Sequence, residues 1–174
     1  DRYRVPNGYP GHPERGVTPG AIISTGSLGM GLSKAVGLAY ANRDRRVLVI
    51  VGDGELQEGS NWEAFMSAAH FGLDNLTAMV DRNRLQQGAR TEDTNGLDPL
   101  DEKLASFGWE VREIDGHDYS ALLDAFGPST TGKPVFVLAN TKKGRGITFM
   151  EDRVEWHHKV PSNDQVIQAL EELN

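Results

Sequence analysis

Apolar and polar residues follow one another along the chain in blocks that predict strands and helices in turn. The run at 46–51 is continuously apolar after its first residue, which is typical of a strand buried on both faces. Three further short runs have strand character, and with the first they predict strands at 46–51, 76–80, 109–114 and 134–139. Apolar residues at helical spacing, together with capping residues, predict helices at 28–41, about 57–71, a segment ending near 107–108, 118–126 and 162–173.

Side-chain spacing and caps add detail to three of these helices. In the helix at about 57–71 we expect four residues to share the buried face: Trp62, Phe65, Met66 and Ala69. Asp118 is the expected N-cap of the helix that follows it, and Ser162 or Asn163 is the expected N-cap of the last helix.

The alternation of strands and helices predicts the fold class. It indicates an α/β protein with a mostly parallel sheet and helices on both faces. In such sheets, ligands bind beyond the carboxyl ends of the strands. The loops after Val51, Val80 and Asn140 begin at those ends, so we expect all three to meet at one crevice.

Composition narrows the class of protein. A chain of 174 residues suits one domain, and 38% hydrophobic with 25% charged residues is typical of a globular protein. The absence of cysteine excludes disulfides and zinc–thiolate sites. A net charge of −7 argues against a nucleic-acid or anionic-membrane surface. No apolar run is long enough to span a bilayer and the first residues do not resemble a signal peptide, so we expect a cytoplasmic protein.

Glycine is frequent, with 20 residues, and it is clustered. Residues 1–28 are rich in glycine and proline and have little periodicity. Such a segment is either a free tail or an ordered loop that lines a site, and the pattern alone leaves both open.

A candidate metal site follows the first two strands. Asp53 lies between two glycines where the first strand ends, and Asn83 follows the end of the second strand. If these strands are neighbours, the Asp53 carboxylate, the Asn83 side-chain oxygen and the Leu85 carbonyl come together. These are hard oxygen ligands that suit Mg²⁺ or Ca²⁺, with phosphate oxygens completing the shell. The pattern therefore predicts a clamp for a metal-bound diphosphate.

This pair of motifs resembles the thiamine diphosphate fingerprint, in which a Gly-Asp-Gly triplet is followed by two asparagines. Here Arg82 replaces the first asparagine, and Asn83 matches the second, which is the ligand in that family. More of the chain resembles one family of this class, the transketolases. The matching motifs occur in order: GHPE at 11–14, TGSLGMG at 25–31, GDGELQEG at 52–59 with WEA at 62–64, KGRGI at 143–147 and EWH at 155–157.

The resemblance implies site residues as well as a fold. It implies metal ligation by Asp53, Asn83 and the Leu85 carbonyl, and a cofactor, thiamine diphosphate, held with Mg²⁺ or Ca²⁺. The implied cofactor-binding residues are Gly26, Ser27, Leu28, Gly52, Asp53, Gly54, Glu55, Asn83, Leu85 and His157. The implied catalytic residues are His12, His157 and Glu58. Glu58 and Glu63 match acidic residues that link two cofactor sites across a dimer, and Lys143 is a candidate phosphate contact.

The five histidines divide by motif context. His12 matches a residue that binds donor-sugar hydroxyls, and His157 matches one that reaches the diphosphate and the substrate. His158 stands where the family usually has glycine, so which of the two adjacent histidines faces the cofactor stays open. His70 and His117 match no motif and are expected to be structural or solvent-exposed.

The resemblance further implies ketol transfer by a two-chain transferase that uses sugar phosphates. Transketolase chains normally have residues before the GHPE motif and a pyrimidine-binding domain that supplies a glutamate, and neither is found here. We therefore expect residues 1–174 to be a diphosphate-binding domain lacking an N-terminal piece. A partner chain would supply the pyrimidine-binding domain in an α2β2 heterotetramer. The alternatives are a subunit of a deoxyxylulose phosphate synthase-like or 2-oxoacid dehydrogenase-like enzyme, or a non-catalytic scaffold.

Overall fold

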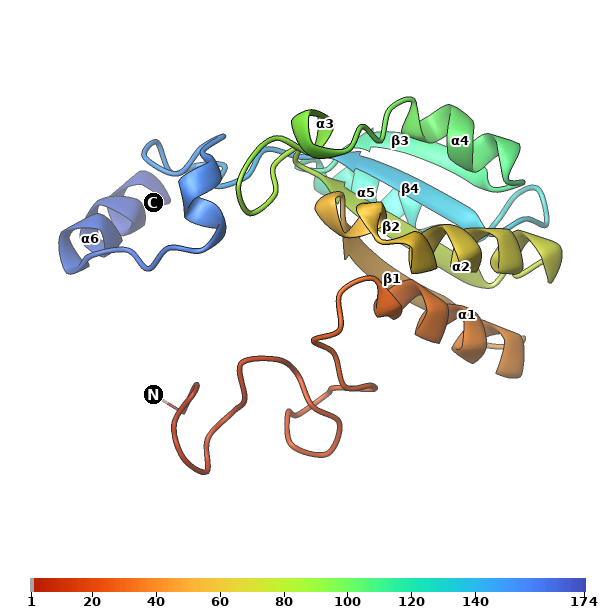
Figure 1. Ribbon diagram of the computed structural model, residues 1–174, viewed down its shortest axis with the longest axis horizontal. Helices are drawn as coiled ribbons and strands as arrows, with labels where there is room; N and C mark the ends of the chain where they lie inside the picture. The colour runs from red at the N-terminus through yellow and green to blue at the C-terminus, as the bar shows by residue number, and fades with distance from the viewer. Residues whose placement is uncertain (1) are drawn as a thin grey trace.

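The computed structural model describes residues 2–174. Its centre is a parallel four-stranded sheet with the strand order β1-β2-β4-β3 (Figure 1). The strands are β1 (Val47–Gly52), β2 (Leu76–Arg82), β3 (Glu110–Asp115) and β4 (Val135–Asn140). This arrangement confirms the predicted α/β class, and each predicted strand is found within two residues of its expected bounds.

Helices join the strands and cover the sheet. The longer ones are α1 (Met30–Ala41), α2 (Gly59–His70), α4 (Leu100–Ser106), α5 (Tyr119–Ala125) and α6 (Asn163–Glu172). Three short turns complete the set: η1 (Gly54–Gln57), α3 (Thr91–Thr94) and η2 (Val154–His157). Asp118 caps α5 and Ser162 caps α6 through their side chains, which confirms both predicted caps.

Two separate apolar clusters show that both faces of the sheet are used. The larger cluster packs α1, α2 and α4 against one face, around Phe65, Leu104 and Phe136. The smaller cluster packs Ala125 of α5 against Val135 and Val137, whose side chains point to the other face. The predicted helices on both faces are thus present, but far fewer residues pack against the face covered by α5 than against the face covered by α1, α2 and α4.

The prediction that the first strand is buried on both faces is wrong. Val51 is 2% exposed, whereas Leu48 and Ile50 are 51% and 64% exposed. The reason is the position of α5, which packs on β3 and β4 and does not extend over β1. One side of β1 therefore remains open among the described residues.

The predicted helix at 57–71 is divided, and its predicted buried face needs correction. An extended residue, Glu58, separates η1 from α2. Met66 is 52% exposed and does not belong to the buried face. The buried residues have the spacing i, i+3, i+4, i+7 and begin at a polar residue: Asn61, Ala64, Phe65 and Ala68. The buried Asn61 Nδ2 donates to the Glu55 carbonyl oxygen at 2.6 Å, which offsets part of the cost of burying this amide.

The helix expected from residue 28 begins at Met30. Gly29 immediately before it adopts φ 81°, a left-handed conformation that favours glycine, so the helical path starts only after it. A side chain is also excluded there, because a Cβ on Gly29 would lie 2.6 Å from the Cβ of Glu58.

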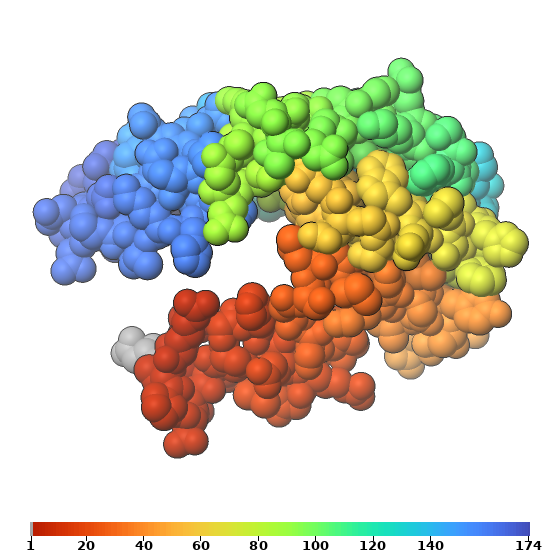
Figure 2. All heavy atoms as spheres, in the orientation of Figure 1, coloured from red at the N-terminus to blue at the C-terminus, as the bar shows by residue number. Residues whose placement is uncertain are grey.

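The two ends of the chain extend from the same side of the sheet. Residues 2–29 and the segment from about 142 onwards leave an open hollow between them, with the carboxyl ends of the strands at its base (Figures 1 and 2). Within residues 2–174, every helix is too short or too polar to cross a bilayer.

Candidate active site

Two adjoining cavities lie at the carboxyl end of β1. The first has a volume of about 350 Å³, and the second about 310 Å³. Nine of the predicted site residues line the first cavity: Leu28, Gly52, Asp53, Gly54, Glu55, Glu58, Asn83, Leu85 and His157. Lys143, from the loop after β4, lines it too, so the loops after three strands meet there as expected.

The second cavity brings together the predicted residues of the N-terminal segment. His12, Gly26 and Ser27 line it, and Leu28 and Glu55 line both cavities. His12 packs directly on the glycine loop, since a Cβ on Gly26 would lie 3.2 Å from its Cγ. The part of the N-terminal segment around His12 and residues 23–28 therefore lines a site. The two predicted catalytic histidines, His12 and His157, line different cavities.

Strand pairing positions Asp53 beside the loop that contains Asn83. β1 and β2 are hydrogen-bonded neighbours, and Gly52 is in register with Asp81. The loop then folds back, so the N–H of Arg84 donates to Asp53 Oδ2 at 2.5 Å. The predicted juxtaposition of Asp53 and Asn83 across neighbouring strands is therefore present.

Asp53 is 1% exposed and is held by several donors. Its Oδ1 accepts from the N–H of Gly54 at 2.7 Å, and its Oδ2 accepts from Arg82 Nη1 at 3.2 Å as well as from Arg84. Burial raises the pKa of the Asp53 carboxyl above its ordinary value, although these N–H donors and the Arg82 charge oppose the rise. A carboxylate desolvated in this way is stabilised by a nearby cation.

The other two candidate ligands present uncharged oxygens. Asn83 Oδ1 accepts from the N–H of Leu85 at 2.9 Å and keeps a second lone pair. The Leu85 carbonyl accepts no hydrogen bond from any residue that the structure describes. Residues 2–174 hold no cluster of three His, Cys, Asp or Glu side chains suited to a metal, so this donor set, with a single carboxylate, depends on backbone and amide oxygens.

The cavity beside Asp53 has an open wall at the Gly-Asp-Gly turn. A Cβ on Gly54 would lie 3.0 Å from the Cβ of Gln86, so glycine keeps this wall of the cavity open. Gln86 Oε1 is buried and has no hydrogen-bond partner among the described residues. The oxygen ligands suit a hard cation, and the open backbone wall leaves room for an anion bound to it. The unpartnered Gln86 oxygen is an acceptor, so it suits a cation or a donor group and not the anion itself.

Glu55 joins the two loops that form the cavities. Its Oε1 accepts from the N–H of Gly29 at 2.9 Å and its Oε2 accepts from the N–H of Gly52 at 3.2 Å. Ser60 on α2 adds a third link by donating to the Gly29 carbonyl at 2.9 Å. Both carboxylate oxygens of Glu55 are thus used to hold the 26–29 loop against the Gly-Asp-Gly turn.

The two acidic residues expected at a dimer interface differ in position. Glu58 is exposed at the start of α2 and lines the first cavity. Glu63 lies one turn further along, is also exposed, and lines neither cavity. Only Glu58 is therefore within the candidate site of this chain.

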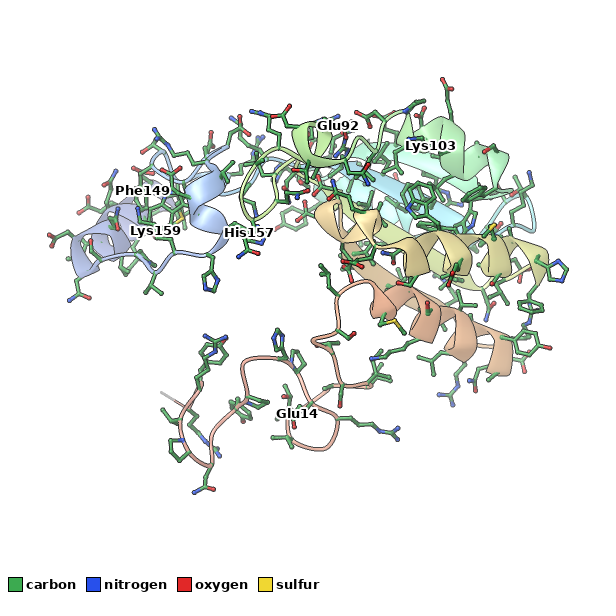
Figure 3. All side chains as sticks on the ribbon, viewed as in Figure 1. Glu14, Glu92, Lys103, Phe149, His157 and Lys159 are labelled. Atoms are coloured by element: carbon green, nitrogen blue, oxygen red, sulfur yellow. The ribbon has the colours of Figure 1, made fainter. Side chains whose placement is uncertain are left out.

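The geometry distinguishes the two adjacent histidines. Both histidines are exposed, but His157 lines the first cavity and lies on the C-terminal segment beside the hollow (Figure 3), whereas His158 lines neither cavity. Burial lowers the pKa of His157, and the charges of Lys143 and His158 lower it further. The nearby Asp53 carboxylate opposes this lowering of the pKa.

The histidines outside the motifs have structural surroundings. His117 Nε2 accepts from the N–H of Lys142 at 2.8 Å and so holds the start of the basic loop. The exposed ring of His70 packs edge-on against Phe71. Both agree with the structural or exposed roles expected from sequence.

Sequence reasoning missed the part played by Arg82. The motif suggests only a replaced asparagine, yet Arg82 is 1% exposed and forms an ion pair with Asp53. The charged pair Asp81 and Arg82 at the end of a mostly apolar strand was the available signal. Gln86, which lines the cavity, was missed as well.

Comparisons with known proteins give the relatives of this chain. Residues 3–173 match the family model described as transketolase, thiamine diphosphate binding domain. An apulose-4-phosphate transketolase subunit of Actinobacillus succinogenes is 51% identical over 169 residues, covering 94% of this chain and 61% of that protein. A 6-deoxy-6-sulfo-D-fructose transketolase subunit of a Clostridium species is 38% identical over 170 residues, covering 94% and 62%.

Solved structures of transketolases have a similar fold. The transketolase of Leishmania mexicana superposes with a TM-score of 0.83 at 30% identity, covering 92% of this chain and 26% of that one. The chain thus spans about three fifths of the curated subunits named above. On sequence, motif order and fold together, the chain belongs to the transketolase family.

Proposed function

We propose that this chain is the diphosphate-binding subunit of a two-chain transketolase that moves a two-carbon ketol unit between sugars. The observation that carries the proposal is the meeting of Asp53, Asn83 and Leu85 at one cavity, beside the open Gly54 turn. The relatives named as transketolase subunits support the same activity.

Thiamine diphosphate, when bound, supplies the chemistry that breaks and forms a carbon–carbon bond next to a ketone carbonyl. The chain's own contribution is to hold it. Asp53, Asn83 and the Leu85 carbonyl would bind Mg²⁺, or Ca²⁺ in its place, and the metal would bind the diphosphate. Gly54 allows the backbone to approach the phosphates, and Lys143 adds a positive charge at the same cavity.

The histidines would act on the sugar. His157 lines the first cavity, and its lowered pKa suits it to accept a proton from a substrate hydroxyl near the diphosphate. His12, in the adjoining cavity, would bind donor hydroxyls and help to orient them. Glu58 would face the second cofactor site of the assembly, on the exposed side of the first cavity.

A partner chain completes the proposed enzyme. It would carry the pyrimidine-binding domain and its glutamate, in an α2β2 assembly located in the cytoplasm. The names of the related subunits support a two-chain enzyme. Those names also favour a specialised sugar, such as apulose 4-phosphate or 6-deoxy-6-sulfo-D-fructose, as a donor to be tested.

The test is an activity assay on the purified complex. The full-length protein, tagged in its own host, should be purified together with a chain that has a pyrimidine-binding domain. We expect the complex to transfer a ketol unit from apulose 4-phosphate, 6-deoxy-6-sulfo-D-fructose or xylulose 5-phosphate to an aldose, and this chain alone to show negligible transfer. Full activity without a partner would contradict the two-chain proposal, and activity only with pyruvate would support another thiamine diphosphate enzyme.

A matched pair of variants, in the same complex, tests whether the chain binds the cofactor or is a non-catalytic scaffold. Asp53→Asn keeps the shape of the side chain but removes the charged metal ligand, so Mg²⁺-dependent binding of thiamine diphosphate should be lost in calorimetry. Asp74→Asn is the control, because Asp74 is exposed in the turn before β2, at the opposite end of the strands. Unchanged binding by Asp53→Asn would remove this residue from the site.

A further inference from the structure

The loop at 26–28 separates the two cavities of the candidate site. Gly26 and Ser27 line the second cavity only, whereas Leu28 lines both. The Leu28 side chain is 63% exposed, so packing against the core does not fix its position. A ligand that extends from one cavity into the other passes Leu28, and the position of this loop therefore sets the space that such a ligand finds.

Gly29 fixes the end of the loop through both of its backbone polar groups. Its N–H donates to Glu55 Oε1 at 2.9 Å, and its carbonyl accepts from Ser60 Oγ at 2.9 Å. Its φ of 81° favours glycine, and a Cβ there would lie 2.6 Å from the Cβ of Glu58. Gly29 thus lies directly against the start of α2, and the two side chains that bind it determine where Leu28 lies.

Glu55 is held on its other side by the end of β1 and by α2. Its Oε2 accepts from the N–H of Gly52 at 3.2 Å, and its own carbonyl accepts from Asn61 Nδ2 at 2.6 Å. The two carboxylate hydrogen bonds, to Gly29 and to Gly52, form what we call the Glu55 bridge. Because both partners are N–H donors, the bridge requires an acceptor at each of its two ends.

The turn that contains Asp53 has hydrogen bonds of its own. The N–H of Asp53 donates to the Asp81 carbonyl at 3.3 Å, and the N–H of Leu56 donates to the Asp53 carbonyl at 3.0 Å. The Asp53 side chain accepts from the N–H of Arg84 at 2.5 Å. Loss of the Glu55 bridge therefore leaves the candidate metal ligands in place and weakens the hold on the loop at 26–28.

We propose that Glu55 is a positioning residue that sets the spacing of the two cavities and so favours a ligand that spans both. This role takes the place of the direct cofactor contact that the resemblance implies. The inference rests on the proposed function, which assigns the diphosphate of thiamine diphosphate to the first cavity. The rest of that cofactor would then extend past Leu28 into the second cavity. Inorganic diphosphate has the same anionic group but occupies only the first cavity, so its affinity should not depend on the Glu55 bridge.

The experiment is calorimetric titration of the complex of both chains, in the presence of Mg²⁺, with thiamine diphosphate and separately with inorganic diphosphate. Glu55→Gln keeps the size of the side chain but offers one acceptor oxygen to two N–H donors, so it breaks the bridge. We expect it to lower the affinity for thiamine diphosphate by about tenfold, the effect of one hydrogen bond to a charged group. The affinity for inorganic diphosphate should stay within about twofold of the wild-type value.

Ser60→Ala distinguishes positioning from direct contact, because Ser60 holds the same loop but lines neither cavity. It should lower the affinity for thiamine diphosphate relative to inorganic diphosphate by about fivefold, as expected for a hydrogen bond between uncharged groups. If Glu55→Gln does not fold, Ser60→Ala carries the test. An effect of Glu55→Gln without any effect of Ser60→Ala would mean that Glu55 binds the cofactor itself, which overturns the inference.

Glu110→Gln is the matched control. Glu110 also accepts from two backbone N–H groups, those of Thr130 and Thr131, but it begins β3 at the end of the sheet opposite the site. Both affinities of this variant should equal those of the wild type. If Glu55→Gln lowers both affinities equally, or lowers neither, the inference is overturned and the proposed function stands. A wild type that binds neither ligand in the presence of Mg²⁺ overturns the proposed function.

Discussion

His157 and His158 are neighbours in sequence, but only the first lies at the candidate site. The short η2 turn directs His157 to the cavity that also contains Asp53 and Lys143. Its pKa is lowered by desolvation and by the charges of Lys143 and His158, against the opposing effect of Asp53. Position on a turn, and not residue type, separates the two side chains.

Alanine variants test this difference at the level of single residues. His157→Ala should lower the affinity for thiamine diphosphate by about tenfold, which corresponds to one hydrogen bond to a charged phosphate. His158→Ala should leave the affinity within about twofold, as expected for a surface side chain that lines neither cavity. Calorimetry on the two-chain complex with Mg²⁺ measures both. The reverse order of effects would assign the site to His158.

The strands differ in how their two sides are covered. β2 and β4 lie inside the sheet and are buried along most of their length, whereas β1 lies at an edge with one side open. Leu76 on β2 is fully buried, and Leu48 on β1 is 51% exposed. The same residue type therefore contributes differently to stability in neighbouring strands.

Two identical substitutions compare the strands directly. Leu76→Ala should lower the free energy of unfolding by about 2–5 kcal/mol, since it leaves a cavity in the core. Leu48→Ala should lower it by less than about 1 kcal/mol, because half of that side chain already contacts water. Urea denaturation gives both values, provided that the dependence of the unfolding free energy on urea concentration is the same in the wild type and the variants. Equal losses would mean that the open side of β1 is covered in solution.

At the scale of the whole molecule, the carboxylate of Glu110 connects the edge strand β3 to the loop before β4. Partial burial opposes the ionisation of Glu110, but hydrogen bonds from Arg112, Thr131, Thr130 and Ser129 outweigh it and hold its pKa to about 2. The ordinary value for this group is 4.5. In the unfolded chain Glu110 therefore takes up a proton at a higher pH than in the folded protein.

This difference predicts how stability depends on pH. The contribution of Glu110 is fully present above about pH 5 and is lost as the pH falls from there towards 2, because protons then favour the unfolded chain. The difference in unfolding free energy between the wild type and Glu110→Gln should accordingly shrink over that interval. Urea denaturation at several pH values measures it, with Glu171→Gln on the exposed face of α6 as control. A difference that stays constant down to pH 2 would show that this carboxylate is not held as described.

Local patterns in the sequence were sufficient for much of the fold and for part of the site. Runs such as 134–139 predict strands, and Asp118 and Ser162 predict helix starts, because these signals depend on residues close together in the chain. Asp53 and Asn83 were also predictable as a pair, since the ends of neighbouring parallel strands meet at one edge.

Other features arose only from contacts between distant parts of the chain. The strand order places β4 between β2 and β3, and the position of α5 leaves the outer side of β1 open. The four partners of Arg82 come from the turn after β1 and from the segment at 91–98, so no pattern around residue 82 predicts them. By itself, the sequence determined the elements and the chemical groups available, because periodicity and caps act over a few residues. Tertiary structure decided which groups meet, because that outcome depends on packing across the whole sheet.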